Sequence, residues 1–455
     1  MELLTVASAA RLLAEGKVSG IELTEQAFTR INDRNGEGAR AFIRTDRPSA
    51  LAQAEAADRL RRHRIVPSPL AGVPISVKDL FDIAGELTLA GSRIRADAAP
   101  AVADAVVIRR LRAAGAVIVG RTNMTEFAFS GLGLNPHYGT PRNPWDRACD
   151  GGSGRIPGGS SSGAAVSVAD GMSVIGLGTD TGGSVRIPAA LCGLTGFKPT
   201  ARRVPLEGTF PLSASLDSIG PIASSVACCA VVDAIIAGEQ PGQDESPDPR
   251  SLRLGLLREF VLEDLDREVA AAFETAISRI CAAGAAVRDV SFPELRELPE
   301  INRGGGFPAP EAYQVHREAL QERGEAFDPR IRARLLRGAQ MSAADYVALR
   351  PHRLRLIASF ERMMQGLDAL LCPTVNMLAP AITALERDDA LYARTNLLML
   401  RNPSLVNFLD GCALSIPCHR PGEAPVGMMV IGSALSDRRL LNTGLAIERL
   451  VAPQC

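Results

Sequence analysis

The sequence predicts an α/β protein in which one large mixed β-sheet is sandwiched between layers of helices. Segments with helical periodicity alternate with short apolar, strand-like runs along the whole chain, which favours this class. A helix–glycine–strand junction also recurs, as Arg110-Leu-Arg-Ala-Ala-Gly-Ala and again as Arg279-Ile-Cys-Ala-Ala-Gly-Ala. At 455 residues, with 46% hydrophobic and 22% charged residues, the chain is long and apolar enough for a large core.

The elements follow in chain order. Residues 5–33 carry apolar side chains three and four apart, which predicts helix, and residues 49–63 predict a second helix. The apolar run 72–78 predicts a strand, and a helix over 103–114 leads into a strand at 116–119. Further strands are expected at 253–257, 286–290, 368–371, 412–416 and 426–431, and further helices at 161–171, 222–237, 265–283, 342–366 and 436–449.

No composition shift divides the chain, so we expect a single domain over residues 1–455. The best linker candidate, residues 238–251, is rich in Gly, Pro, Asp and Gln. Residues 292–340 carry prolines and many charges but few strand signals. They predict a helical excursion from the sheet that spans about 292–366.

Composition excludes several classes of function. The net charge of −1, one Trp and four Tyr argue against nucleic-acid binding. Nine cysteines without a CxxC pair are typical of reduced thiols, so we expect a cytoplasmic protein. We expect no secretory leader, no membrane span and no metal or organic cofactor, because neither the apolar runs nor the His and Cys spacing fit them. The oligomeric state is unreadable, with a homodimer as the default expectation.

Two Gly-Gly-Ser units carry the chemistry. Ser160 and Ser184 stand 24 residues apart, and Lys78 ends the strand-like run upstream. Glycines before a serine let backbone N–H groups turn toward an oxyanion. A flexible loop or an anion-binding loop at a helix N-terminus are the alternative interpretations. The phosphate-loop and nucleophile-elbow patterns are absent, and the five histidines lie far from both units, which disfavours a Ser-His-Asp triad.

The motifs together resemble the amidase signature family of Ser-Ser-Lys amide hydrolases. The resemblance is dense over about residues 65–225 and loose elsewhere. The matching segments are 70–79, 120–123, 143–146, 157–163, 178–189, 192–193, 196–200, 215–221 and, more weakly, 425–427.

The resemblance implies a role for each catalytic residue. Lys78 matches the catalytic lysine, Ser160 the bridging serine that follows a cis peptide bond, and Ser184 the nucleophile. The backbone amides of Thr181, Gly182, Gly183 and Ser184 match the oxyanion hole. A lysine can act as the base only if burial or a positive neighbour lowers its pKa.

The expected substrate is a small-molecule amide, with candidate pocket residues Phe127, Phe129, Ser130 and Gly159. Asp180 and Arg186 flank the nucleophile, and a buried pair that braces the loop is favoured over a substrate-carboxylate site. The segment that joins Asp146 to Ile156, residues 147–155, is longer than the corresponding segment usually is in the family. They form either a rim loop at the mouth of the site or surface padding.

Three functions remain in competition. The first is an amidase that hydrolyses a linear amide through an acyl-serine intermediate. The alternative is the A subunit of a glutamyl-tRNA amidotransferase, which holds the amine of glutamine with an acidic residue in its C-terminal part. Residues 391–409 contain no Asp or Glu, which counts against it, although Arg353 is left as a candidate carboxylate-binding residue. A non-catalytic ligand-binding protein is disfavoured because Lys78, Ser160 and Ser184 are all present.

Overall fold

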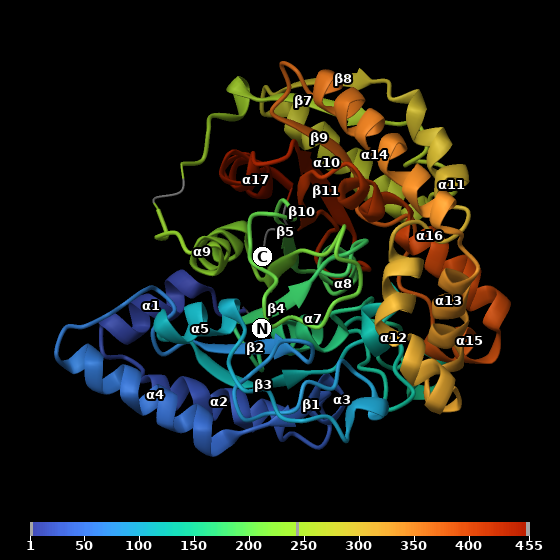
Figure 1. Ribbon diagram of the computed structural model, residues 1–455. Helices are drawn as coiled ribbons and strands as arrows, with labels where there is room; N and C mark the ends of the chain where they lie inside the picture. Colours follow the sequence, from blue (N-terminus) through green and yellow to red (C-terminus); the bar gives the residue numbers. More distant parts are fainter. Residues whose placement is uncertain (1–2, 243–244, 452–455) are drawn as a thin grey trace.

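The computed structural model describes residues 3–242 and 245–451. Its strands are β1 (Phe42–Thr45), β2 (Pro74–Lys78), β3 (Val117–Thr122), β4 (Ile175–Thr179), β5 (Thr195–Lys198), β6 (Ile219–Ala223), β7 (Arg253–Leu257), β8 (Ala286–Val290), β9 (Ala369–Pro373), β10 (Cys412–Pro417) and β11 (Gly427–Gly432). They form one sheet in the order β1-β3-β2-β4-β6-β5-β10-β11-β9-β7-β8 (Figure 1). Strand β2 pairs in parallel with β3 and β4, β7 pairs in parallel with β8 and β9, and the other pairings are antiparallel. The predicted α/β fold with a large mixed sheet is confirmed.

Helices cover both faces of this sheet. They are α1 (Val6–Ala14), α2 (Gly20–Ile31), α3 (Gly38–Ala41), α4 (Arg47–Arg62), α5 (Val106–Ala113), α6 (Cys149–Gly152), α7 (Ser162–Ala169), α8 (Arg186–Leu191), α9 (Val226–Ala237), α10 (Arg267–Ala282), α11 (Leu298–Ile301), α12 (Pro308–Arg323), α13 (Pro329–Ala339), α14 (Ala343–Met363), α15 (Ile382–Arg387), α16 (Asp389–Phe408) and α17 (Asp437–Val451). The periodic segment 5–33 divides in two because Ser19 and Glu22 form a capping box that starts α2.

Strand β3 shows how the two layers share the sheet. Val117 and Val119 pack in a cluster with α2, α4, α7 and α8, whereas Ile118 packs in another cluster with α1, α5, α9 and α17. Successive side chains of a strand point to opposite faces, so a strand with helices on both sides is apolar throughout. This is why the buried strands read as continuous apolar runs.

Sequence patterns miss four strands, β1, β4, β5 and β6, three of which contain glycine. A Cβ atom at Gly176 would lie 2.7 Å from the carbonyl oxygen of Ala164, and one at Gly178 would lie 2.7 Å from Ser161 Oγ. Helix α7 therefore packs directly on β4 because the strand lacks side chains there. Glycine weakens the strand signal and permits this close approach.

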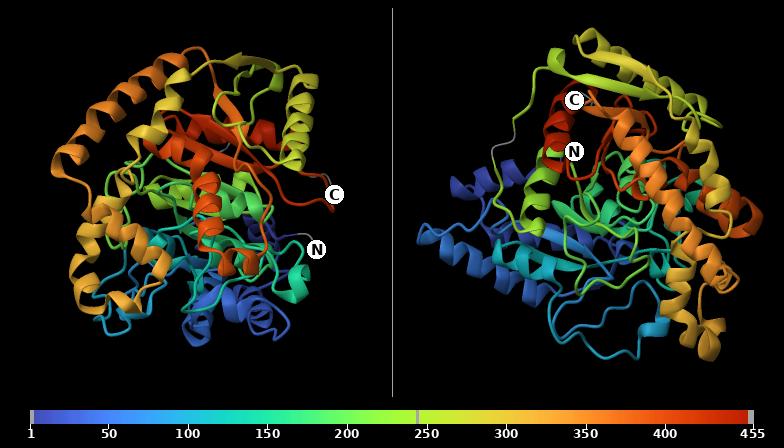
Figure 2. Two further views of the ribbon diagram at one scale, coloured as in Figure 1. Left: turned by 90° about the vertical axis from the view of Figure 1, so that its right-hand side faces the viewer. Right: turned by 45° about the horizontal axis from the view of Figure 1, so that its top comes forward.

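Residues 293–363 form helical elements only and contain no strand. Figure 2 shows from two sides that α12, α13 and α14, drawn in gold to orange, lie together outside the sheet. A second core cluster lies between α14, α16 and the C-terminal strands. Within the described ranges, no helix is long and apolar enough to cross a membrane.

Candidate active site

The fold brings Lys78, Ser160 and Ser184 together at the carboxyl ends of strands β2 and β4. Lys78 is the last residue of β2, and Ser184 lies in the loop that follows the neighbouring parallel strand β4. Ser160 lies in the loop that precedes α7, which packs on both strands. The carboxyl ends of adjacent parallel strands meet at one edge, so the two loops that follow β2 and β4 must meet there.

Lys78 is fully buried beside Ser160. Its Nζ lies 2.8 Å from Ser160 Oγ and 2.9 Å from Thr179 Oγ1. Burial lowers the pKa of Lys78 from 10.5 to about 7, although the charges of Asp180 and Asp217 act in the opposite direction. At neutral pH a large fraction of this lysine is therefore uncharged, and its lone pair can accept a proton.

Ser184 is the member of this group that a substrate can reach. Its residue surface is only 4% exposed, but it lines a cavity that Lys78 and Ser160 do not reach. The peptide bond between Gly159 and Ser160 is cis, as the resemblance implies. The amide of Ser161 donates to the carbonyl oxygen of Ser184 at 3.2 Å, which ties the two loops together.

A buried ion pair braces the loop that carries Ser184. Arg186 Nη2 lies 2.8 Å from Asp180 Oδ1, and both side chains are fully buried. Asp180 also accepts from the backbone amides of Gly183 at 2.8 Å and Val185 at 3.1 Å. Burial acts to raise the pKa of Asp180, but Arg186 outweighs it and holds that pKa well below the usual range. The bracing interpretation of this pair agrees with the geometry.

The amides proposed for the oxyanion hole are not equivalent. That of Gly183 is committed to Asp180, so it cannot also serve a substrate oxygen. The amides of Thr181, Gly182 and Ser184 make no hydrogen bond to the described residues. Thr181 and Gly182 line the cavity together with Ser184, so these three amides are the ones available to an oxyanion there.

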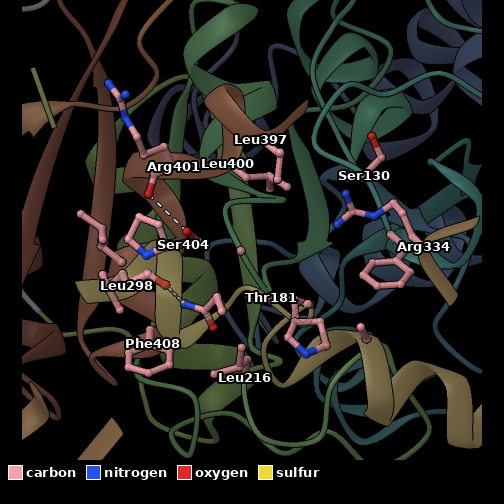
Figure 3. A pocket seen from close by; sticks show the side chains of 18 of the residues that line it. Ser130, Thr181, Leu216, Leu298, Arg334, Leu397, Leu400, Arg401, Ser404 and Phe408 are labelled. Carbon is pink, nitrogen blue, oxygen red and sulfur yellow. Dashed lines mark hydrogen bonds between the residues drawn. The ribbon is translucent and has the colours of Figure 1, made fainter. Parts of the chain in front are cut away.

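The cavity next to Ser184 has a volume of about 790 Å³ and lies between the strand-end loops and helices α11, α12, α13 and α16 (Figure 3). Of the four candidate pocket residues, Phe129 and Ser130 line it. Phe127 and Gly159 do not. The Phe127 ring packs 4.1 Å from the ring of His316, and a Cβ at Gly159 would lie 2.5 Å from the Gly133 amide nitrogen. Their placement differs from the expectation because both pack against other residues of the protein and do not face the cavity.

Residues 147–155 lie away from this cavity and are tied to the body of the protein. None of them lines the cavity. Arg147 pairs with Asp170 at 2.8 Å, and Arg155 pairs with Asp146 at 2.8 Å and donates to the Ala379 carbonyl at 2.9 Å. Of the two interpretations left open for this segment, the contacts favour a surface element over a rim loop at the mouth.

Two further features escape the sequence analysis. Thr179 lies within the matching segment 178–189, but nothing in the sequence marks it as the second hydrogen-bond acceptor of Lys78, at 2.9 Å. Charged side chains of the cavity wall come from helices and loops with no motif, so no sequence signal marks them. They are Asp264, Arg303, Arg334, Arg337, Arg394 and Arg401. Arg353, by contrast, donates to the backbone carbonyls of Ser215, Asn407 and Phe408 and does not line the cavity.

Comparisons with known proteins give a consistent result. A family model described as Amidase matches residues 22–441. The chain is 36% identical over 415 residues to a 2-amino-5-chloromuconic acid deaminase of Comamonas testosteroni, covering 90% of this chain and 88% of that protein. It is also 36% identical over 482 residues to the A subunit of a glutamyl-tRNA(Gln) amidotransferase from Chloroflexus aggregans, covering 98% and 96%.

Solved structures agree with this result. A crystal structure of an amidase superposes with a TM-score of 0.87 at 34% identity and covers 98% of this chain and 100% of that one. A peptide amidase from Stenotrophomonas maltophilia superposes with a TM-score of 0.83 at 28% identity, covering 99% and 97%.

Proposed function

Because the chain belongs to the amidase family, we propose that it hydrolyses the carbon–nitrogen bond of a small linear amide through an acyl-Ser184 intermediate. The observation that carries the proposal is the buried contact between Lys78 Nζ and Ser160 Oγ, directly behind a serine that lines the cavity. A serine hydroxyl needs a base, and a lysine with a pKa of about 7 is a competent one at neutral pH.

The reaction proceeds in two halves. Neutral Lys78 takes the proton of Ser160, which takes that of Ser184, while Ser184 Oγ attacks the amide carbonyl carbon. The oxyanion accepts hydrogen bonds from the amides of Thr181, Gly182 and Ser184. The proton then passes through Ser160 to the leaving nitrogen as the carbon–nitrogen bond breaks. In the second half, water gives its proton to the same relay, attacks the acyl ester and releases the acid and Ser184.

The second candidate function is the glutaminase half of a glutamyl-tRNA amidotransferase. The near-complete match to such a protein, with 36% identity, favours it. The cavity argues against it, because Asp264 is the lone acidic residue among the described lining residues and already pairs with Arg401 at 3.1 Å. An ammonium group of glutamine would thus find no free carboxylate. Arg353 is likewise committed to backbone carbonyls.

The test is release of ammonia by the isolated chain from a panel of amides, ureas and glutamine. We expect hydrolysis of at least one small amide without partner proteins, and loss of turnover by roughly four or more orders of magnitude in Ser184→Ala. Ser162→Ala is the matched control from the same serine run, because its hydroxyl makes only a 3.4 Å contact to the Asn123 carbonyl. If glutamine is the one substrate hydrolysed, and if its hydrolysis requires partner proteins, the amidotransferase function is established instead.

A further inference from the structure

The wall of the cavity beside Ser184 is strongly cationic, although the whole chain has a net charge of −1. Its lining includes five arginines and one carboxylate, that of Asp264, which Arg401 neutralises. The remaining arginines, Arg303, Arg334, Arg337 and Arg394, are contributed by the α11–α12 connection and by helices α13 and α16. Of these four, Arg303 pairs with Glu300 at 3.4 Å. A cavity lined by one sign of charge within low-dielectric walls attracts ligands of the opposite sign.

Arg334 is the arginine whose environment calls for a ligand. Its guanidinium lies over the ring of Phe129, 4.5 Å from the centroid, and Figure 3 shows it on the same side of the cavity as Ser130. Its Nε is enclosed and has no hydrogen-bond partner among the described residues. Burial lowers the pKa of Arg334, Tyr392 acts in the opposite direction, and the neighbouring charge of Arg337 lowers it further. The ring contact positions this cation but satisfies none of its N–H donors.

Two other arginines of the same helix have the carboxylate partner that Arg334 lacks, and a third, Arg337, donates to the Arg303 carbonyl at 2.9 Å. Arg330 pairs with Asp389 at 2.8 Å, and Arg332 pairs with Glu325 at 2.5 Å. Arg334 forms no salt bridge within the described ranges. An unpaired guanidinium inside a protein is costly, and it stays charged because its pKa is so high. Arg334 therefore lines the cavity as a cation without a counter-ion.

Resting on the proposed function, we infer that the substrates are amides that carry a carboxylate and no ammonium group, and that Arg334 holds this carboxylate. Much of the remaining lining of the cavity is apolar and suits the hydrocarbon part of a substrate. The apolar lining includes Leu212, Leu216, Leu298, Leu400, Leu405 and Phe408. The absence of an unpaired carboxylate among the described lining residues disfavours α-amino acid amides. The half-amides of aliphatic dicarboxylic acids have this chemistry.

Matched amides test the inference on the whole protein. Succinamic, glutaramic and adipamic acids are compared with butanamide, pentanamide and hexanamide, which differ only in lacking the carboxylate, and glutaramic acid is compared with glutamine, which adds the ammonium. We expect kcat/KM for the best half-amide to exceed that of its neutral match by roughly 100-fold, the scale of a buried charge pair. We expect glutamine to be poorer than glutaramic acid. Equal rates for every matched pair would overturn the inference and leave the proposed function standing.

Variants then locate the binding group. Arg334→Met should lower kcat/KM for the half-amide roughly 100-fold more than for its neutral match, and Arg334→Lys should recover part of the difference. Arg332→Met is the control, because Arg332 lies two residues away and does not line the cavity. An equal loss on both amides in Arg334→Met would mean a structural role and would overturn the assignment.

Binding to Ser184→Ala separates the inference from the proposed function. Calorimetry should show that this variant binds adipamic acid more tightly than hexanamide, and that the added substitution Arg334→Met removes the preference. If this preference is found but no amide is turned over by the wild type, the inference stands and the proposed function fails. If the wild type turns over amides but the variant shows no binding preference for adipamic acid, the proposed function stands and the inference fails.

Discussion

Replacement of Lys78 by methionine should stabilise the protein at pH 7 while it abolishes activity. In the native chain the pKa of Lys78 is about 7, against 10.5 for an ordinary lysine. Between these values the unfolded chain carries a proton that the native chain has released, so wild-type stability rises with pH across this window. At pH 7 the native state is thereby destabilised by ~4 kcal/mol, and at pH 10 by ~1 kcal/mol.

The methionine variant avoids this cost but loses the hydrogen bonds from Lys78 to Ser160 and Thr179. Each bond contributes about 1 kcal/mol. The variant should therefore be about 2 kcal/mol more stable than the wild type at pH 7, and about 1 kcal/mol less stable at pH 10. The difference between the two free energies of unfolding changes sign because the unfolded wild type binds a proton at Lys78 at pH 7 and largely loses it by pH 10, whereas the methionine variant has no group there to titrate.

Urea unfolding of both proteins at pH 7 and pH 10, followed by circular dichroism, measures this difference. Lys17→Met is the matched control, because Lys17 is exposed at the surface beside Glu15 and its replacement should shift stability little at either pH. A stability difference between Lys78→Met and wild type that stays constant from pH 7 to pH 10 would refute the reasoning, since it would mean that the native lysine keeps its proton.

The remaining predictions concern the base, the loop brace and the surface segment. The rate kcat/KM should fall about tenfold per pH unit below pH 7 as Lys78 takes up a proton, and a flat profile from pH 5 to pH 9 would exclude a neutral-lysine base. Asp180→Asn should lower the free energy of unfolding by about 3–5 kcal/mol, because Arg186 remains buried without its counter-ion. Asp410→Asn, which breaks a more exposed pair with Arg202, should cost under about 1 kcal/mol in the same urea titration. Shortening residues 147–155 to the usual family length should reduce stability, since it removes the Arg147–Asp170 and Arg155–Asp146 pairs, and should leave kinetic constants unaltered over an amide panel; a changed substrate preference would restore the rim-loop interpretation.

The sequence by itself determined the fold class and the family. Alternating helical and apolar runs predict the sheet between helix layers, because a strand with helices on both faces must be apolar throughout. The resemblance of the Gly-Gly-Ser units and Lys78 to the amidase signature family implies their reaction class. Sequence patterns do not predict the glycine-containing strands β4, β5 and β6, because glycine has a low strand propensity. In β4 the glycines are needed because α7 packs closely on the strand.

Only the tertiary structure decided what faces the substrate. Phe127 and Phe129 lie two residues apart in one loop, yet only Phe129 lines the cavity, because the backbone at Phe127 takes a left-handed turn with φ of 51°. Arg330, Arg332 and Arg334 are alike in sequence, and only packing leaves Arg334 without a carboxylate at the cavity wall. Even the lowered pKa of Lys78 arises from burial among strands and loops distant in sequence, because desolvation depends on everything that surrounds a group.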